Sequence, residues 1–266
     1  MSLRSPAVAG SFYPKRAQEL RREVEGFVTG SPRVRALAVV APHAGYRYSG
    51  PTAGAAYSAV EVPQDVVILA FNHGMRGAPI AVWPEGGWTT PLGEAPVNAD
   101  LARRIRDGCP GAEFDEAGHI GEHSAEVQVP FLQVARPDVR IVPVALSLDI
   151  DRVEELEAFG RALAAMLRDE LVVCSTDLNH YEDEETTLAR DRKVIEPMER
   201  LDARGLVRAI AEHGVTMCGF APAIATLAYA RARGATRAET IDHRTSAAAS
   251  GDRERCVGYV GMVIRG

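Results

Sequence analysis

Three of the seven histidines follow directly on apolar runs of strand length: His43, His73 and His180. Imidazole binds transition metals and, with a pKa near neutrality, takes up and releases protons at physiological pH. A histidine in a loop can equally be a solvated or hydrogen-bonded residue that binds nothing. Because the three lie far apart in the chain and match no local metal motif, only the fold could assemble them into one site.

A fourth histidine lies in the polar stretch Glu122-His123-Ser124-Ala125-Glu126. A serine with a polar residue soon after it is typical of a helix N-terminus, which would place His123 at the cap and Glu126 in the first turn. The stretch is therefore either a capping box without chemistry or the source of an imidazole and a carboxylate for the same site.

Cys218 is followed by Gly219 and, three residues further on, by Pro222, which suits the first turn of a helix. A thiol just before a helix N-terminus has its pKa lowered by the helix dipole, which favours the thiolate, a nucleophile and a metal ligand. The alternative is a small buried apolar residue, the usual role of a free cysteine. The other three cysteines form no CxxC pair, and we expect them to be buried.

Four continuous apolar runs predict buried strands, at residues 35–41, 65–70, 139–146 and 171–175. Stretches 237–243 and 257–264 are expected to complete or edge the sheet. Segments of helical period lie between these runs, at 16–28, 50–60, 98–107, 124–136, 151–169, 186–200, 203–213 and 221–233. This alternation predicts an α/β fold with a mostly parallel central sheet flanked by helices, in a single domain over 1–266. Ligands of such sheets bind beyond the carboxyl ends of the strands, where three of the histidines are expected.

The composition is that of a globular protein, with 46% hydrophobic and 25% charged residues and a net charge of −6. The absence of a basic excess argues against a nucleic-acid or anionic-membrane partner. No apolar run approaches the ~20 residues of a membrane helix, and the first residues do not read as a signal peptide. We therefore expect a cytoplasmic protein with reduced thiols.

Several of these stretches, in their order along the chain, resemble the Memo family (mediator of cell motility), whose prokaryotic members are called AmmeMemoRadiSam system protein B. The resemblance extends from residue 9 to about 262. It rests on Ala9-Gly10-Ser11-Phe12-Tyr13, Ala41-Pro42-His43-Ala44-Gly45-Tyr46, Asn72-His73, Glu122-His123-Ser124-Ala125-Glu126, Ser175-Thr176-Asp177-Leu178-Asn179-His180 and Cys218-Gly219.

The resemblance implies a fold like that of the class III (LigB-like) extradiol dioxygenases, which are non-haem iron enzymes. It also implies a metal pocket formed by His43, His73 and Cys218, with His180 and His123 nearby. The dioxygenases use a carboxylate as the third ligand, where this chain has Cys218. Two further departures are Gly74 and Gln128, at positions where the Memo pattern often has histidine.

Two imidazoles and a thiolate suit one transition-metal ion, for which we expect Fe(II), with copper and zinc as alternatives. Such a ligand set leaves coordination positions open to water, oxygen or substrate. His180 is the expected proton shuttle. Asp177 or Glu126 is the expected acceptor for an imidazole N–H, and His123 completes the catalytic candidates.

Three functions fit these residues. The first is a metal-dependent redox enzyme, dioxygenase-like, acting on a small organic substrate. The second is a binding or adaptor module that recognises a peptide or partner protein, as animal members of the family are described to do. The third is a metal-free hydrolase with Cys218 as nucleophile. The family association further suggests a pathway shared with AMMECR-type and radical-SAM proteins.

Overall fold

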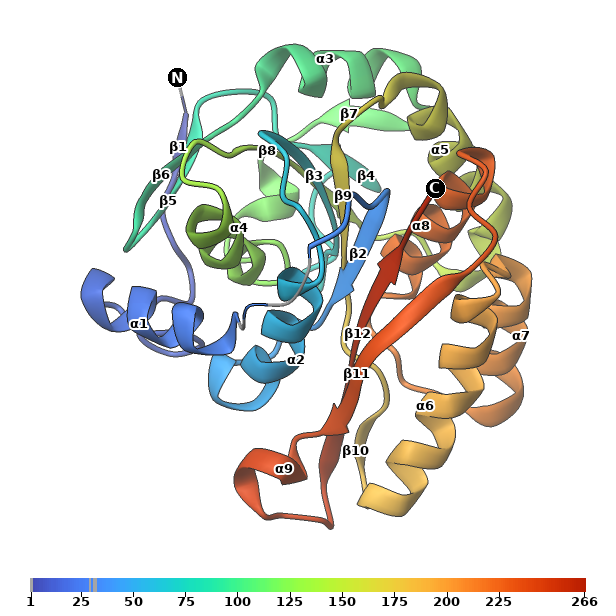
Figure 1. The fold of residues 1–266 in the computed structure, drawn as a ribbon. Coiled ribbons are helices and arrows are strands. Elements are labelled where there is room, and N and C mark those ends of the chain that lie inside the picture. The colour runs from blue at the N-terminus through green and yellow to red at the C-terminus, as the bar shows by residue number, and fades with distance from the viewer. Residues whose placement is uncertain (1, 29, 31–32) are drawn as a thin grey trace.

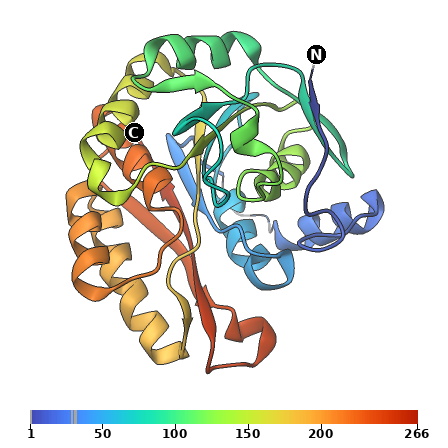
Figure 2. The ribbon, with the colours of Figure 1, turned by 180° about the vertical axis from the view of Figure 1, so that it is seen from behind.

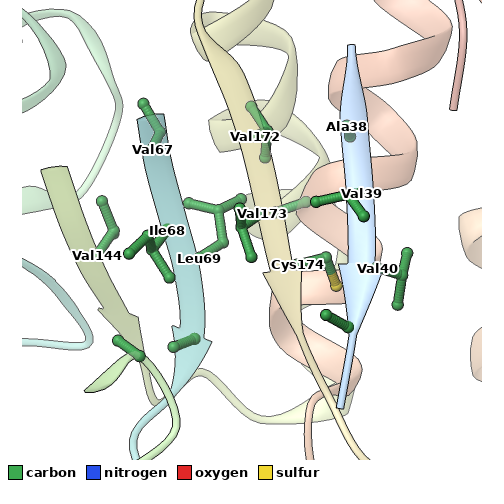
Figure 3. Packing of buried hydrophobic residues seen from close by; sticks show 14 of the residues in the cluster. Ala38, Val39, Val40, Val67, Ile68, Leu69, Val144, Val172, Val173 and Cys174 are labelled. Carbon is green, nitrogen blue, oxygen red and sulfur yellow. The ribbon is translucent and has the colours of Figure 1, made fainter. Parts of the chain in front are cut away.

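The computed structural model describes residues 2–28, 30 and 33–266. Its centre is a nine-stranded sheet whose middle four strands run parallel, in the order β2 (Ala38–Ala41), β9 (Leu171–Ser175), β3 (Asp65–Phe71) and β8 (Arg140–Leu146). Valine, isoleucine and leucine from these strands interlock in the core (Figure 3). The apolar runs of the sequence thus form the expected buried parallel strands.

On each side of the four central strands the next strand of the sheet is antiparallel to them. On one edge β12 (Cys256–Ile264) pairs with β2, and β11 (Ala238–Thr245) and β10 (His180–Glu182) both pair with β12. On the other edge β4 (Ile80–Val82) pairs with β8, and β7 (Ala112–Phe114) lies beyond it, parallel to β4. The expected parallel arrangement therefore holds for the four central strands, where a helix lies between strands of the same direction: α2 between β2 and β3, and α5 between β8 and β9.

Helices cover both faces of the sheet, as Figure 1 shows and Figure 2 shows from behind. On one side lie α1 (Ala17–Phe27), α2 (Tyr46–Ser58) and α4 (Val129–Ala135). On the other side lie α5 (Val153–Met166), α6 (Glu184–Glu199), α7 (Ala203–His213) and α8 (Phe220–Ala232). The remaining elements are α3 (Ala99–Gly108), α9 (Ala247–Ser250), three 3-10 turns (Ala117–His119, Glu126–Gln128 and Ile150–Arg152) and a small sheet of β1 (Leu3–Arg4), β5 (Gly87–Thr90) and β6 (Gly93–Pro96).

Two helices begin elsewhere than the sequence indicates. The helix expected from residue 50 begins at Tyr46, and Pro51 lies inside it, so the proline does not mark its start. The helix expected from Ser124 is a 3-10 turn followed by α4 from Val129, and neither has a side-chain cap. Within the described residues, no helix combines the length and the hydropathy that a membrane crossing requires.

Candidate metal centre

A pocket of about 570 Å3 opens at the carboxyl ends of the parallel strands, between the loops that follow β2, β3 and β9. Its polar lining consists mainly of four histidines, an aspartate and a cysteine: His43, His73, His123, His180, Asp177 and Cys218. Phe12 and Val257 add apolar surface. The fold thus brings the three histidines that follow strands into one cavity, together with His123 and Cys218.

His43, His73 and Cys218 each offer one ligand atom, and these atoms lie within 4.8 Å of one another. The Nε2 of His43 is 3.2 Å from the Sγ of Cys218. Metal–N bonds of about 2.0–2.1 Å and a metal–S bond of about 2.3 Å, at angles of roughly 90–110°, place the two atoms about 3.1–3.6 Å apart. The donor set and its spacing therefore fit one transition-metal ion.

The ring of His43 is held in one tautomer by the residues beneath it. Its Nδ1 is 3.0 Å from the Oγ of Ser175, whose single proton is donated to the carbonyl oxygen of Ser124 at 2.7 Å. The same Oγ accepts a hydrogen bond from Nε2 of Gln128 at 2.8 Å. Because the hydroxyl has no second proton to give, Nδ1 of His43 must donate, which leaves the Nε2 lone pair pointing to Cys218.

Glu122 holds His73 in the corresponding way. One carboxylate oxygen accepts from Nδ1 of His73 at 3.0 Å and from the backbone N–H groups of His123 and Ser124 at 2.8 and 2.9 Å. The other accepts the backbone N–H of His73 at 2.6 Å. Nε2 of His73 therefore keeps its lone pair for a metal. His73, Glu122 and His123 are a second group whose ligand atoms lie close enough together to hold a metal ion. However, four N–H donors already bind the two carboxylate oxygens of Glu122.

The electrostatics of the pocket favour neutral imidazoles. Burial, followed by the charge of His73, lowers the pKa of His43 to about 3, and burial lowers the pKa of His123 to about 4. Burial raises the pKa of Glu122, but the hydrogen bond and charge of His73 outweigh it, and the net pKa is well below the usual range. At neutral pH the rings of His43 and His123 thus each keep one nitrogen lone pair free of a competing proton.

The thiol of Cys218 differs from the expectation of a thiolate. The residue does lie directly before Gly219, the N-cap residue of α8. However, burial and then the charge of Asp177 raise its pKa well above the ordinary value, and backbone N–H groups lower it only in part. The metal-free thiol is therefore protonated at neutral pH, whereas a bound cation would displace the proton.

His180 and Asp177 approach the pocket from the loop after β9. The Nδ1 of His180 donates to the carbonyl oxygen of Thr216 at 2.9 Å, so its Nε2 is the nitrogen left to accept a proton. Asp177 accepts the backbone N–H of His43 at 2.7 Å, and its other oxygen is 4.0 Å from Nε2 of His43, beyond hydrogen-bond distance. Asp177 thus fixes the loop of His43, and among the residues that the structure describes it accepts no imidazole N–H.

Glu126 is buried but makes no hydrogen bond to an imidazole among the described residues. Its oxygens accept from the guanidinium of Arg4, from the backbone N–H groups of Ala7 and Val8, and from the hydroxyl of Tyr13, at 2.7, 2.7, 3.0 and 2.7 Å. It therefore anchors the N-terminal segment. The acceptor role expected of Glu126 belongs to Glu122.

The sequence analysis missed the residues that orient the histidines of the pocket: Glu122, Ser175, Gln128 and Thr216. A signal existed for two of them. Ser175 ends a predicted strand beside the expected site, and Glu122 directly precedes a histidine. Ser124, expected as a cap, donates its hydroxyl proton to the carbonyl oxygen of Phe71 at 2.6 Å and ties the loop to β3.

Comparison with known proteins gives one consistent result. The sequence model of a family described as Memo-like protein matches residues 4–263. A MEMO1 family protein of Aquifex aeolicus is 38% identical over 99% of this chain and 100% of its own length. Another, from Methanopyrus kandleri, is 37% identical over 98% and 99%. A crystal structure of an uncharacterised protein of Escherichia coli K12 covers 87% of this chain and 100% of its own, with a TM-score of 0.55 and 16% identity, which supports the fold alone.

Proposed function

The chain belongs to the Memo-like protein family, and from that premise we propose that it is a metal-dependent redox enzyme, dioxygenase-like, acting on a small organic substrate. The convergence of His43, His73 and Cys218 supports the proposal, because both imidazoles have Nδ1 engaged and Nε2 available. The pocket of about 570 Å3 beside them has the size of a small-molecule site.

We propose Fe(II) as the native metal, with copper or zinc as alternatives. Nitrogen and sulfur donors suit these ions, whereas calcium and magnesium prefer oxygen ligands. When bound, the metal supplies open coordination positions at which oxygen and substrate can react.

The other residues of the pocket bind the substrate, transfer its proton or hold the metal ligands in place. His180 takes a substrate proton at Nε2, because its Nδ1–H stays bonded to Thr216. His123 is neutral above its pKa of about 4 and serves as a hydrogen-bond partner for the substrate. Asp177 keeps the backbone of His43 in place. Phe12, whose ring centroid is 4.9 Å from that of His123, lines the pocket and gives a ligand an apolar surface beside this imidazole.

Metal analysis and oxygen uptake test the proposal. Anaerobically purified protein and a Cys109→Ser control, whose cysteine ends α3 and does not line the pocket, should carry one transition metal per chain. Cys218→Ser should lose it, and retained metal would show that the third ligand is another residue. Iron-loaded protein should consume oxygen with a member of a catechol panel, and His43→Ala should not. No uptake with any member, despite bound iron, would contradict the enzyme.

One observation favours the adaptor function as a second candidate. Met75 and Ile120, which are 54% and 63% exposed, lie two and three residues along the chain from the pocket-lining His73 and His123, so the loops that carry these histidines also carry exposed apolar side chains. Partner binding that survives His43→Ala would support this candidate, and turnover abolished by His43→Ala would contradict it. The metal-free hydrolase is less favoured, since burial keeps the thiol of Cys218 protonated.

A further inference from the structure

The strand that carries His180 contains an extra residue. In the antiparallel pairing of β10 with β12, His180 faces Val257 and Glu182 faces Cys256, so a two-residue step on β10 matches a one-residue step on β12. Tyr181 is the residue in between, and its φ of 62° lies in the left-handed region. The irregularity is therefore a β-bulge at Tyr181, and bulges of this kind redirect side chains beside functional sites.

The bulge changes which side chains reach the pocket. In a regular strand, consecutive side chains point to opposite faces, so His180 and Tyr181 could not both line one cavity. Both do line it. Thr216 holds His180 through the backbone N–H at 2.8 Å and through Nδ1 at 2.9 Å, so the histidine is fixed and the bulge turns Tyr181 to the same side.

This arrangement is unfavourable for the fold taken alone. A bulky residue in the left-handed region is strained, and glycine would adopt the same conformation without strain. Packing of the ring does not compensate, because Tyr181 is 66% exposed. Its aromatic neighbour is His180, at 5.6 Å between ring centroids, and the guanidinium of Arg255 lies 5.5 Å from its ring centroid. The aromatic ring of Tyr181 is thus largely exposed to solvent at the mouth of the metal pocket.

We propose that Tyr181 is a substrate-binding residue whose ring stacks on a planar, conjugated ring of the ligand. Strained residues cluster at ligand sites, and a largely uncovered aromatic face is a surface on which another flat ring packs favourably. The inference rests on the proposed function, which places the reacting end of the ligand at the metal, and it adds the contact that holds the far end.

Binding of 4-nitrocatechol to zinc-loaded protein tests this contact, because zinc is redox-inert and the absorbance of the probe reports binding. Tyr181→Phe keeps the ring and should bind the probe within about twofold of the original protein. Tyr181→Leu should bind it about five- to tenfold more weakly, as the loss of one aromatic contact predicts. Tyr48→Leu is the matched control, since Tyr48 is also exposed and also lies near an arginine but does not line the pocket.

Tyr181→Gly supplies a second measurement, the melting temperature of the metal-free protein. If the ring is kept for binding, glycine should raise the melting temperature by about 1–4 °C through relief of strain, while it weakens probe binding as much as leucine does. A lower melting temperature would mean that the ring is kept for packing and would overturn the inference. Unchanged probe affinity in both Tyr181→Leu and Tyr181→Gly would also overturn it. Failure of the original zinc-loaded protein to bind the probe would instead count against the proposed function.

Discussion

Glu122 and Glu126 lie four residues apart in one short stretch, and both are buried carboxylates that accept four hydrogen bonds. Glu122 serves the pocket, where it fixes the ring of His73. Glu126 serves the N-terminal segment, where it pairs with Arg4 at 2.7 Å, and the two side chains of that ion pair are 4% and 1% exposed. The pocket near Glu122 thus contains imidazole nitrogens with free lone pairs, whereas the ion pair of Glu126 with Arg4 is enclosed by protein.

The comparison shows that burial, charge and hydrogen bonding do not by themselves identify a functional carboxylate. The two residues differ in whether their hydrogen-bond partner keeps a nitrogen that can still bind a metal. The partner of Glu122 is an imidazole with one nitrogen left over, whereas the partner of Glu126 is a guanidinium that also donates to the carbonyl oxygens of His119 and Glu122. Loss of Glu126 should therefore affect folding, and loss of Glu122 should affect metal binding.

The largest expected effect is that of Glu126→Ala on stability. The substitution leaves Arg4 buried without its carboxylate, and breaking a buried ion pair typically reduces the free energy of unfolding by about 3–5 kcal/mol. Urea denaturation of metal-free protein measures it. Glu19→Ala, which breaks an exposed pair with Arg16, should change little and serves as the control. Metal affinity of the folded Glu126→Ala protein should stay the same. A large loss of metal affinity would show that Glu126 also supports the metal pocket, which would contradict the distinction between the two regions.

Glu122→Gln should act mainly on the metal. It removes the charge and an acceptor that hold His73, and loss of such a partner typically lowers metal affinity by about 10–100-fold. Stability should fall less than in Glu126→Ala, because the side chain of His73 is 34% exposed and can turn to water. Competition with a chelator of known affinity measures the change. Equal metal affinity in Glu122→Gln and the original protein would refute the role of Glu122.

The third expected effect, which needs no substitution, separates the regions by pH. Metal binding removes the proton of Cys218, whose pKa is raised by burial, so affinity should increase about tenfold for each unit of pH between 6 and 8. Glu122 adds nothing to this slope. Its folded pKa lies below the unfolded value of about 4.3, so its stabilising charge is complete above that value and is lost only as the pH falls below it. Metal titrations at three pH values suffice, and a flat profile would argue against a thiolate ligand.

Much of the fold could be predicted because its signals are local. Continuous runs of valine, isoleucine and leucine identify the four central strands, since a strand covered on both faces needs apolar side chains at every position. The direction of β12 carries no such signal, because a buried strand has the same apolar pattern whether it runs parallel or antiparallel to its neighbour. The 3-10 turn at Glu126–Gln128 was likewise hidden, since Ser124 suits a helix cap but bonds to β3.

The sequence by itself determined the family, the central sheet and the three strand ends at which histidines occur. Only the tertiary structure decided which carboxylate meets an imidazole, which nitrogen of each ring is free, and that Tyr181 turns into the pocket. The physical reason is that these outcomes depend on side-chain direction. Direction is set by a single φ angle at Tyr181, by one hydroxyl proton at Ser175, and by the packing of Glu126 on a residue more than a hundred positions away along the chain.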